Sequence, residues 1–214
     1  MDSNDLVTAT SNGLYCAPGD FYIDPWKAVE NAVITHAHGD HLRAGSQRYY
    51  AAAPGAEVVR HRLPPDTLLE PVAYGRTIEF GAVRVSFHPA GHILGSAQIK
   101  IEHQDRVWVV SGDYKRDADP TCEPFAAVPC DVFVSEATFA LPAYRWAETA
   151  VVAGEILEWW RRNRERGVAS VLFAYALGKA QRILAELALR SDDAVEVHGA
   201  DASLVDIYLS LIHI

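Results

Sequence analysis

The segment ITHAHGDHLRAG, residues 34–45, constrains this chain more than any other feature of its sequence. It places three histidines and one aspartate within six positions, directly after the apolar run NAVI. Imidazole nitrogens and carboxylate oxygens are common zinc ligands, and a turn at the end of a buried strand directs several of them at one point. His36 and His38 share strand parity and are expected to serve one ion, whereas Asp40 and His41 face a neighbouring ion. Clustered titrating groups repel one another, so solvated loop histidines are the less favoured interpretation.

The order of apolar patterns along the chain predicts an α/β fold. Apolar runs or period-two alternation predict strands over 21–24 and 31–36, hairpins over 76–92 (turning at Gly81) and 97–113, and a strand ending near Glu136. From Trp146 the spacing becomes helical, with Gly167 as the stop. Segments 178–190 and 202–212 are also helical, and 168–177 and 194–199 are strand-like. Alternating helices and strands are typical of layered α/β domains.

Composition excludes several classes of protein. The 214 residues are 50% hydrophobic, which is enough for a sizeable core. The 19 Lys+Arg against 28 Asp+Glu give a net charge of -9, which argues against a broad basic surface for nucleic acid but leaves room for a local cationic site. Three scattered cysteines favour neither disulfides nor a thiolate zinc site. Without a signal-like or membrane-spanning segment, we expect a cytoplasmic protein with no membrane association.

The segment THAHGDH resembles the signature of the metallo-β-lactamase-fold hydrolases, whose αβ/βα sandwich binds two metal ions at its edge. Three further motifs follow that family's order: YIDP with Asp24, PAGHILGS with His92, and SGDYKR with Asp113. The resemblance implies two Zn²⁺ ions, or Mn²⁺ in their place. The implied ligands are His36, His38 and His92 on the first ion, Asp40 and His41 on the second, and Asp113 between them. Asp24 is expected to orient a ligand from behind.

The segment SEATF resembles the acidic motif of the β-CASP group, the members of this family that cleave nucleic acids, and places Glu136 near the metals. In that group a cap domain follows, and FAYALGKAQRIL is similar to one of its strand-to-helix segments. We therefore expect the N-terminal part of a metallo-β-lactamase-like domain over 1–140 and a partial β-CASP-like α/β cap over 141–214. Helix-start amides with Lys179 are candidate phosphate contacts, unless Lys179 is simply solvated.

Residues 111–146 are most similar to bacterial DNA exonucleases associated with ATP-dependent DNA ligases, which are relatives of RNA 3′-end processing nucleases. The resemblance implies two-metal hydrolysis of phosphodiester bonds in DNA, or also in RNA, during repair or end processing with a DNA ligase as partner. Asp40, Asp113 and Glu136 are the implied catalytic residues, with Asp40 also holding the attacking hydroxide. Lys115 and Arg116 are candidate phosphate contacts, with a solvated turn as the alternative.

One departure from the family pattern affects the second ion, which normally takes another histidine from near the C-terminal end of the enzyme. His198 and His213 do not lie in a matching context, so we expect this chain to be the N-terminal portion of a longer enzyme. Two other functions stay open: a small-molecule metallo-hydrolase of the thioesterase or lactamase type, and a catalytically inactive metal-binding fragment. The helix from Trp146 counts against the first of these. The other histidines are expected to be structural or solvent-facing, namely His61, His88 and His103.

Overall fold

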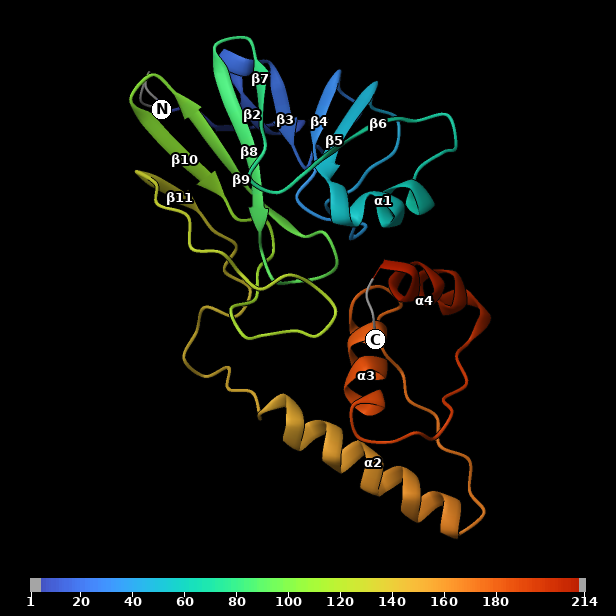
Figure 1. Ribbon diagram of the computed structural model, residues 1–214. Coiled ribbons are helices and arrows are strands. Elements are labelled where there is room, and N and C mark those ends of the chain that lie inside the picture. Colours follow the sequence, from blue (N-terminus) through green and yellow to red (C-terminus); the bar gives the residue numbers. More distant parts are fainter. Residues whose placement is uncertain (1–4, 212–214) are drawn as a thin grey trace. The chain divides into compact units, whose positions relative to one another are not determined.

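The protein, a computed structural model that describes residues 5–211, divides into two compact units. Unit 1 is Met1–Glu136 and unit 2 is Ala137–Ile214 (Figure 1). All strands of the described residues lie in unit 1, which holds two sheets. Unit 2 contributes three helices.

The first sheet of unit 1 has six strands that are neighbours in the order in which they occur in the chain. Its strands are β1 (Thr8–Thr10), β2 (Gly13–Cys16), β3 (Phe21–Ile23), β4 (Asn31–Val33), β5 (Arg48–Ala52) and β6 (Leu68–Val72). Strands β1 to β3 pair antiparallel, and β3 to β6 pair parallel. Helix α1 (Ala56–Arg62) follows β5, and its buried side chains Ala56, Val58 and Val59 face this sheet.

The second sheet has the order β11-β10-β9-β8-β7. Its strands are β7 (Thr77–Phe80), β8 (Val83–Pro89), β9 (Ala97–His103), β10 (Arg106–Val110) and β11 (Val132–Val134). Both predicted hairpins form, since β7 pairs antiparallel with β8 and β9 with β10. Gly81 makes the first turn with φ 57°, a left-handed conformation that favours glycine. Strand β11 pairs parallel with β10.

The two sheets of unit 1 share one hydrophobic core. Alternate residues of each strand point inward, as the period of two requires, and Val85, Phe87, Ile99 and Ile101 of the second sheet are fully buried. They belong to the same cluster as Phe21 and its neighbours from the first sheet. Burial of this kind contributes roughly 25 cal/mol for each Å² of apolar surface. The predicted mixed α/β sandwich is confirmed.

The described part of unit 2 contains helices α2 (Thr149–Glu165), α3 (Lys179–Ala188) and α4 (Gly199–Leu211), joined by segments without regular secondary structure. Helix α2 packs against α3, and α3 packs against α4, around buried Leu157, Ala185 and Tyr208. Gly167 follows α2 with φ 66°, which is the glycine stop that the sequence predicts. The helical predictions for this part of the chain are confirmed.

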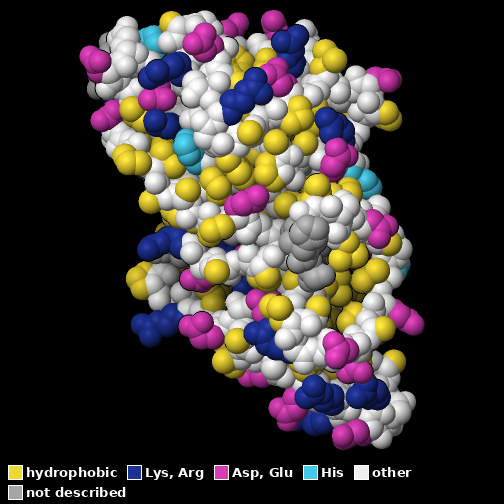
Figure 2. Space-filling view, in the orientation of Figure 1, with side chains coloured by type: hydrophobic (Ala, Val, Ile, Leu, Met, Phe, Trp, Pro, Cys, Tyr) yellow, Lys and Arg dark blue, Asp and Glu magenta, His cyan; other side chains and the backbone are white. Residues whose placement is uncertain are grey.

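The prediction of strands over 168–177 and 194–199 is wrong for the structure, because 168–175 and 194–198 pair with no strand, 176–177 lie in a turn, and Gly199 begins α4. A strand is stabilised by hydrogen bonds to a neighbouring strand and by burial of at least one face. Here the apolar side chains stay exposed, with Phe173 at 93%, Tyr175 at 76% and Val171 at 66%. Hydrophobic side chains are visible at the surface among charged ones in Figure 2.

Two further features of the structure concern the charges at its surface and the length of its helices. On the face seen in Figure 2, basic and acidic side chains are interspersed, in keeping with the net charge of -9. Among residues 5–211, none of the helices combines the length and the apolar character needed to cross a membrane.

Candidate metal centre

The turn that carries THAHGDH begins where β4 ends at Val33, earlier than the sequence predicts. Asp24 accounts for this early end, because its Oδ1 accepts the Thr35 backbone N–H at 2.8 Å in place of a strand partner. The chain then folds back, and the carbonyl of His38 accepts the N–H groups of His41 and Leu42 at 3.1 and 2.9 Å. The histidines of the motif are thereby held on a short turn at one edge of the sandwich.

His92 lies in the loop between β8 and β9. This loop is held by hydrogen bonds to its own Ser96 and by close packing against the loop after β10. The Ser96 hydroxyl oxygen accepts the N–H groups of His92 and Ile93 at 3.0 and 3.2 Å. Gly91, with φ 72°, has no room for a side chain, since a Cβ there would lie 2.3 Å from the Lys115 carbonyl oxygen. Sequence reasoning missed Ser96, although a serine directly after Gly95 and four residues after His92 is a usable signal of a tight loop.

Asp113 follows β10, and its loop contacts both neighbouring loops. The Lys115 N–H donates to the Ala90 carbonyl at 2.9 Å, which ties this loop to the loop of His92. Gly112 has φ 56°, and a Cβ there would lie 2.6 Å from the Thr35 hydroxyl oxygen. The three ligand-bearing loops are therefore packed directly against one another.

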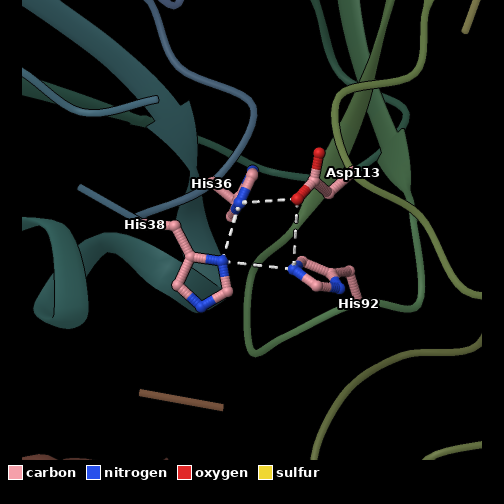
Figure 3. Close-up of side chains that lie close together, drawn as sticks. All are labelled: His36, His38, His92 and Asp113. Carbon is pink, nitrogen blue, oxygen red and sulfur yellow. Dashed lines mark hydrogen bonds and ion pairs between the residues drawn. The ribbon is translucent and has the colours of Figure 1, made fainter. Parts of the chain in front are cut away.

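His36, His38, His92 and Asp113, called here the three-histidine site, point their side chains at one another (Figure 3). His36 Nε2 lies 3.0 Å from His38 Nδ1, which lies 3.2 Å from His92 Nε2. Asp113 Oδ2 is 3.7 Å from His92 Nε2 and 3.9 Å from His36 Nε2. Ligands that surround a zinc ion tetrahedrally at about 2.0–2.1 Å lie roughly 3.3 Å apart. The four donor atoms lie within 4.8 Å of one another, which is close enough for one ion to contact all of them after small side-chain shifts.

Two imidazoles of this site, His36 and His92, are held in the neutral form that metals require. Burial, followed by repulsion from the other histidines, lowers the pKa of His36 well below its usual value. Burial and the neighbouring His38 lower the pKa of His92 to about 4. Neutral imidazole is the ligand form, so at these two rings protons do not compete with an ion at neutral pH.

Asp40, His41 and Asp113 form a second group, called here the His41 site. His41 Nε2 lies 3.4 Å from Asp113 Oδ1 and 3.7 Å from Asp40 Oδ2. Asp113 therefore presents one oxygen to each group, as expected for a bridging carboxylate. Asp24 Oδ2 accepts the Nδ1–H of His41 at 2.8 Å, so Asp24 orients this ring from behind as the sequence predicts. Asp40 is exposed, with 77% of its side chain accessible.

The charge state of His41 differs from that of the other histidines. Burial lowers its pKa, but hydrogen bonds to Asp113 and Asp24 outweigh that effect and raise the pKa to about 10. The same hydrogen bond from His41 lowers the pKa of Asp113. A positive charge between these carboxylates is thus favoured, and in the chain by itself a proton on His41 supplies it.

The remaining candidates from the first unit lie around this centre. Glu136 follows β11, and its charge acts on His92, whose pKa it raises slightly against the larger effects. Lys115, predicted as a phosphate contact, is instead engaged within its own loop. Its Nζ donates to Asp119 at 3.3 Å and to the Ala118 carbonyl at 3.1 Å. Arg116 is exposed beside it.

Lys179 lies in unit 2, at the first residue of α3. Its Nζ lies 5.4 Å from the centre of the Tyr175 ring, within the range of a cation–π contact. Gly178, just before the helix, donates its N–H to Gln181 Oε1 at 2.7 Å. His213 lies outside the described residues.

This strand-edge cluster of histidines with a shared aspartate, on an α/β sandwich, is a group that could hold a metal ion. The comparisons agree. A probable DNA ligase of Opitutus terrae is 31% identical over 200 residues, which is 92% of this chain and 20% of that protein. A ribonuclease of Thermus thermophilus is 28% identical over 77% of this chain and 44% of its own. An RNase J-like protein of Methanocaldococcus jannaschii is 24% identical, over 74% and 43%.

The chain is a homologue of the β-CASP nucleases that have the metallo-β-lactamase fold. It spans between about a fifth and less than half of the length of these curated relatives. No family model matches the sequence. A crystal structure of a protein of unknown function from Enterococcus faecalis has the same fold, with a TM-score of 0.54 and 14% identity over 82% of this chain and 48% of that one.

Proposed function

We propose that the protein is a cytoplasmic, metal-dependent phosphodiesterase that acts as a DNA exonuclease in repair or end processing. The single observation that carries this proposal is the three-histidine site, whose donor atoms lie within 4.8 Å of one another. Relatives named as nucleases, and one named as a probable DNA ligase, support a nucleic-acid substrate and a ligase as partner.

The proposed metal set is two Zn²⁺ ions, or Mn²⁺ in their place, one at each group. The three-histidine site would hold the first ion, and the His41 site would hold the second, with Asp113 shared. Such ions supply positive charge for the phosphate oxygens and lower the pKa of bound water. The chain's own residues hold the ligands: Asp24 keeps the Nδ1–H of His41 turned away from the centre, and Ser96 fixes the loop of His92.

Two carboxylates complete the proposed catalytic centre. Asp40 is exposed next to His41, in a position to hold the attacking hydroxide by hydrogen bonding. Glu136 adds negative charge near His92. Residues 141–214 would be a partial β-CASP-like cap, and Arg116 and Lys179 are the exposed cations proposed to contact phosphates.

RNA is a second candidate substrate, because the Thermus thermophilus relative is named a ribonuclease and a Gibberella zeae relative, 25% identical over 77% of this chain, an endoribonuclease. The experiment that tests the proposal measures metal content of the 214-residue chain by elemental mass spectrometry. A cleavage assay on end-labelled single-stranded DNA, double-stranded DNA and RNA follows. We expect bound zinc and metal-dependent release of nucleotides from DNA ends.

The matched variants are His92→Ala and His103→Ala. His92 is a ligand of the three-histidine site, whereas His103 ends β9 in a hairpin turn. Loss of zinc and cleavage in His92→Ala but not in His103→Ala supports the proposal. A chain that binds no zinc would exclude it, and bound zinc with no cleavage of any of the three substrates would favour the inactive metal-binding fragment.

A further inference from the structure

A buried hydroxyl lies behind the metal centre, at a position to which the sequence motifs assign no role. Thr35 is 1% exposed and sits between the end of β4 and His36. Its Oγ1 lies 2.6 Å from Asp24 Oδ2 and 3.1 Å from His36 Nδ1. This one oxygen therefore touches both the carboxylate that orients His41 and a ring of the three-histidine site.

The hydrogen-bond directions follow from the atoms available. Asp24 is acceptor-only when ionised, so the Thr35 hydroxyl proton must go to Asp24. The hydroxyl oxygen is then left to accept, and the partner at 3.1 Å is the Nδ1–H of His36. A proton on Nδ1 leaves the Nε2 lone pair of His36 directed at His38 and Asp113. Thr35 thus selects the tautomer that ligates metal.

The backbone of Thr35 fixes the hydroxyl in place. Its N–H donates to Asp24 Oδ1 at 2.8 Å, and its carbonyl accepts the Ala97 N–H at the start of β9 at 2.8 Å. Gly112 packs against its side chain so closely that a Cβ there would lie 2.6 Å from both Thr35 Cβ and Oγ1. Thr35 is held by the β4, β9 and β10 ends at once.

We propose that Thr35 is a positioning residue that couples the two metal-binding groups, through one hydroxyl that donates to Asp24 and accepts from His36. Asp24 Oδ2 also accepts from His41 Nδ1, so the chain of contacts runs His36, Thr35, Asp24, His41. This inference rests on the proposed metal centre. The expected loss on removing an outer partner of a ligand histidine is about 10–100-fold in metal affinity.

The test compares zinc affinity of Thr35→Val and Thr35→Ser with that of the unaltered 214-residue chain, by competition with a chromogenic chelator. Valine keeps the shape and removes the hydroxyl, whereas serine keeps the hydroxyl. Thr121→Val is the matched control, because Thr121 is equally buried and donates to Asp119 at 2.6 Å. We expect about 10–100-fold weaker zinc binding in Thr35→Val only.

A second readout follows the His36 ring directly. Long-range ¹H–¹⁵N spectra of the metal-free chain should show the proton on Nδ1 in the unaltered chain and in Thr35→Ser. A proton on Nε2 of His36 in the unaltered chain contradicts the inference. This result does not depend on whether Thr35→Val folds, which circular dichroism would show. Equal zinc affinity of folded Thr35→Val and the unaltered chain also overturns it, as does equal weakening of the serine variant. Absence of zinc binding in the unaltered chain would instead overturn the proposed function.

Discussion

The three-histidine site and the His41 site share Asp113 and both take histidines from the turn after β4, yet they differ in charge. Burial keeps His36 and His92 neutral, with lowered pKa values. His41 lies between Asp24 and Asp113, which raise its pKa to about 10. The first group therefore offers lone pairs at neutral pH, whereas the second must give up a proton before it can ligate an ion. His36 and His41 lie close together in the sequence, yet they differ in charge because different groups contact the two rings.

This difference predicts an order of filling. An ion at the three-histidine site replaces no proton on His36 or His92, so it should bind tightly and with little dependence on pH near neutrality. An ion at the His41 site displaces the proton of His41, so its apparent affinity should rise with pH. The difference between the two sites can be tested first by substituting Asp113, which both share, and then by substitutions that affect one site.

The largest effect is expected from Asp113→Ala, which removes an oxygen from both groups at once. The chain should lose the second ion completely and bind the first much more weakly than the 10–100-fold loss typical of outer partners. Elemental analysis after dialysis against a chelator measures this loss. Asp105→Ala, in the exposed turn between β9 and β10, is the control. Two retained ions would mean that Asp113 does not bridge.

A smaller loss of metal affinity, mainly at the His41 site, is expected from Asp24→Asn. An amide places an NH2 group at one of the two oxygen positions, so it cannot accept the Thr35 N–H at one position and the Thr35 hydroxyl and His41 at the other, and the His41 ring loses its fixed orientation. Affinity at the His41 site should fall about 10–100-fold, with less change at the three-histidine site. Stepwise zinc titration separates the two affinities. Asp131→Asn, where the carboxylate accepts only the Val107 N–H at 2.7 Å, should change neither.

The charge difference also predicts how stability of the metal-free chain depends on pH. The pKa of His41 is raised in the folded chain, so its stabilisation is complete below its unfolded pKa near 6.5 and is lost as pH rises towards 10. His92, with a folded pKa of about 4, contributes stability above pH 6.5 that is lost as pH falls towards 4. Each titrating group changes the free energy of unfolding by at most about 1.4 kcal/mol per pH unit.

Urea unfolding of the chelator-treated chain between pH 4 and pH 10 measures both arms of this profile. Stability should be greatest near pH 6.5–7, between the two titrations. Asp24→Asn should flatten the alkaline arm, because it removes one of the hydrogen bonds that raise the pKa of His41. His92→Ala should flatten the acid arm. An alkaline arm that is unchanged in Asp24→Asn would contradict the assignment of that arm to His41.

The ligand set is implied by the resemblance of four motifs to the metallo-β-lactamase-fold hydrolases, and the structure brings His36, His38, His92 and Asp113 together. The motif histidines follow β4, His92 follows the first hairpin and Asp113 follows the second, and these three strand ends meet at one edge of the sandwich. The opposite charge states of His41 and His92 do not follow from the motif, since they depend on Asp24 and on burial, both set by tertiary packing. The hydroxyl of Thr35 lies inside the motif, but only its three-dimensional neighbours reveal a role.

Outside the metal centre, the sequence predicts where helices form better than it predicts which segments pair as strands or which side chains pair with one another. The helices of unit 2 form where 3.6-residue spacing and Gly167 place them, because helices satisfy their own backbone. The segments 168–177 and 194–199 have strand composition, but a strand also needs a neighbour, which composition does not supply. The ion pair of Lys115 with Asp119, four residues further on, is likewise a partner that the sequence analysis does not predict.

The smallest effect is expected outside both groups, at the adjacent cations Lys115 and Arg116. Lys115 is 20% exposed and paired with Asp119, so Lys115→Ala should lower stability by about 1 kcal/mol and leave DNA affinity unchanged. Arg116 is exposed, so Arg116→Ala should weaken DNA binding a few-fold and reduce the slope of log affinity against log salt by about one. Fluorescence anisotropy with labelled DNA at several salt concentrations measures both, and both variants should keep their zinc. If Lys115→Ala carries the salt effect instead, its ion pair opens when substrate binds, and the loop after Asp113 moves with it.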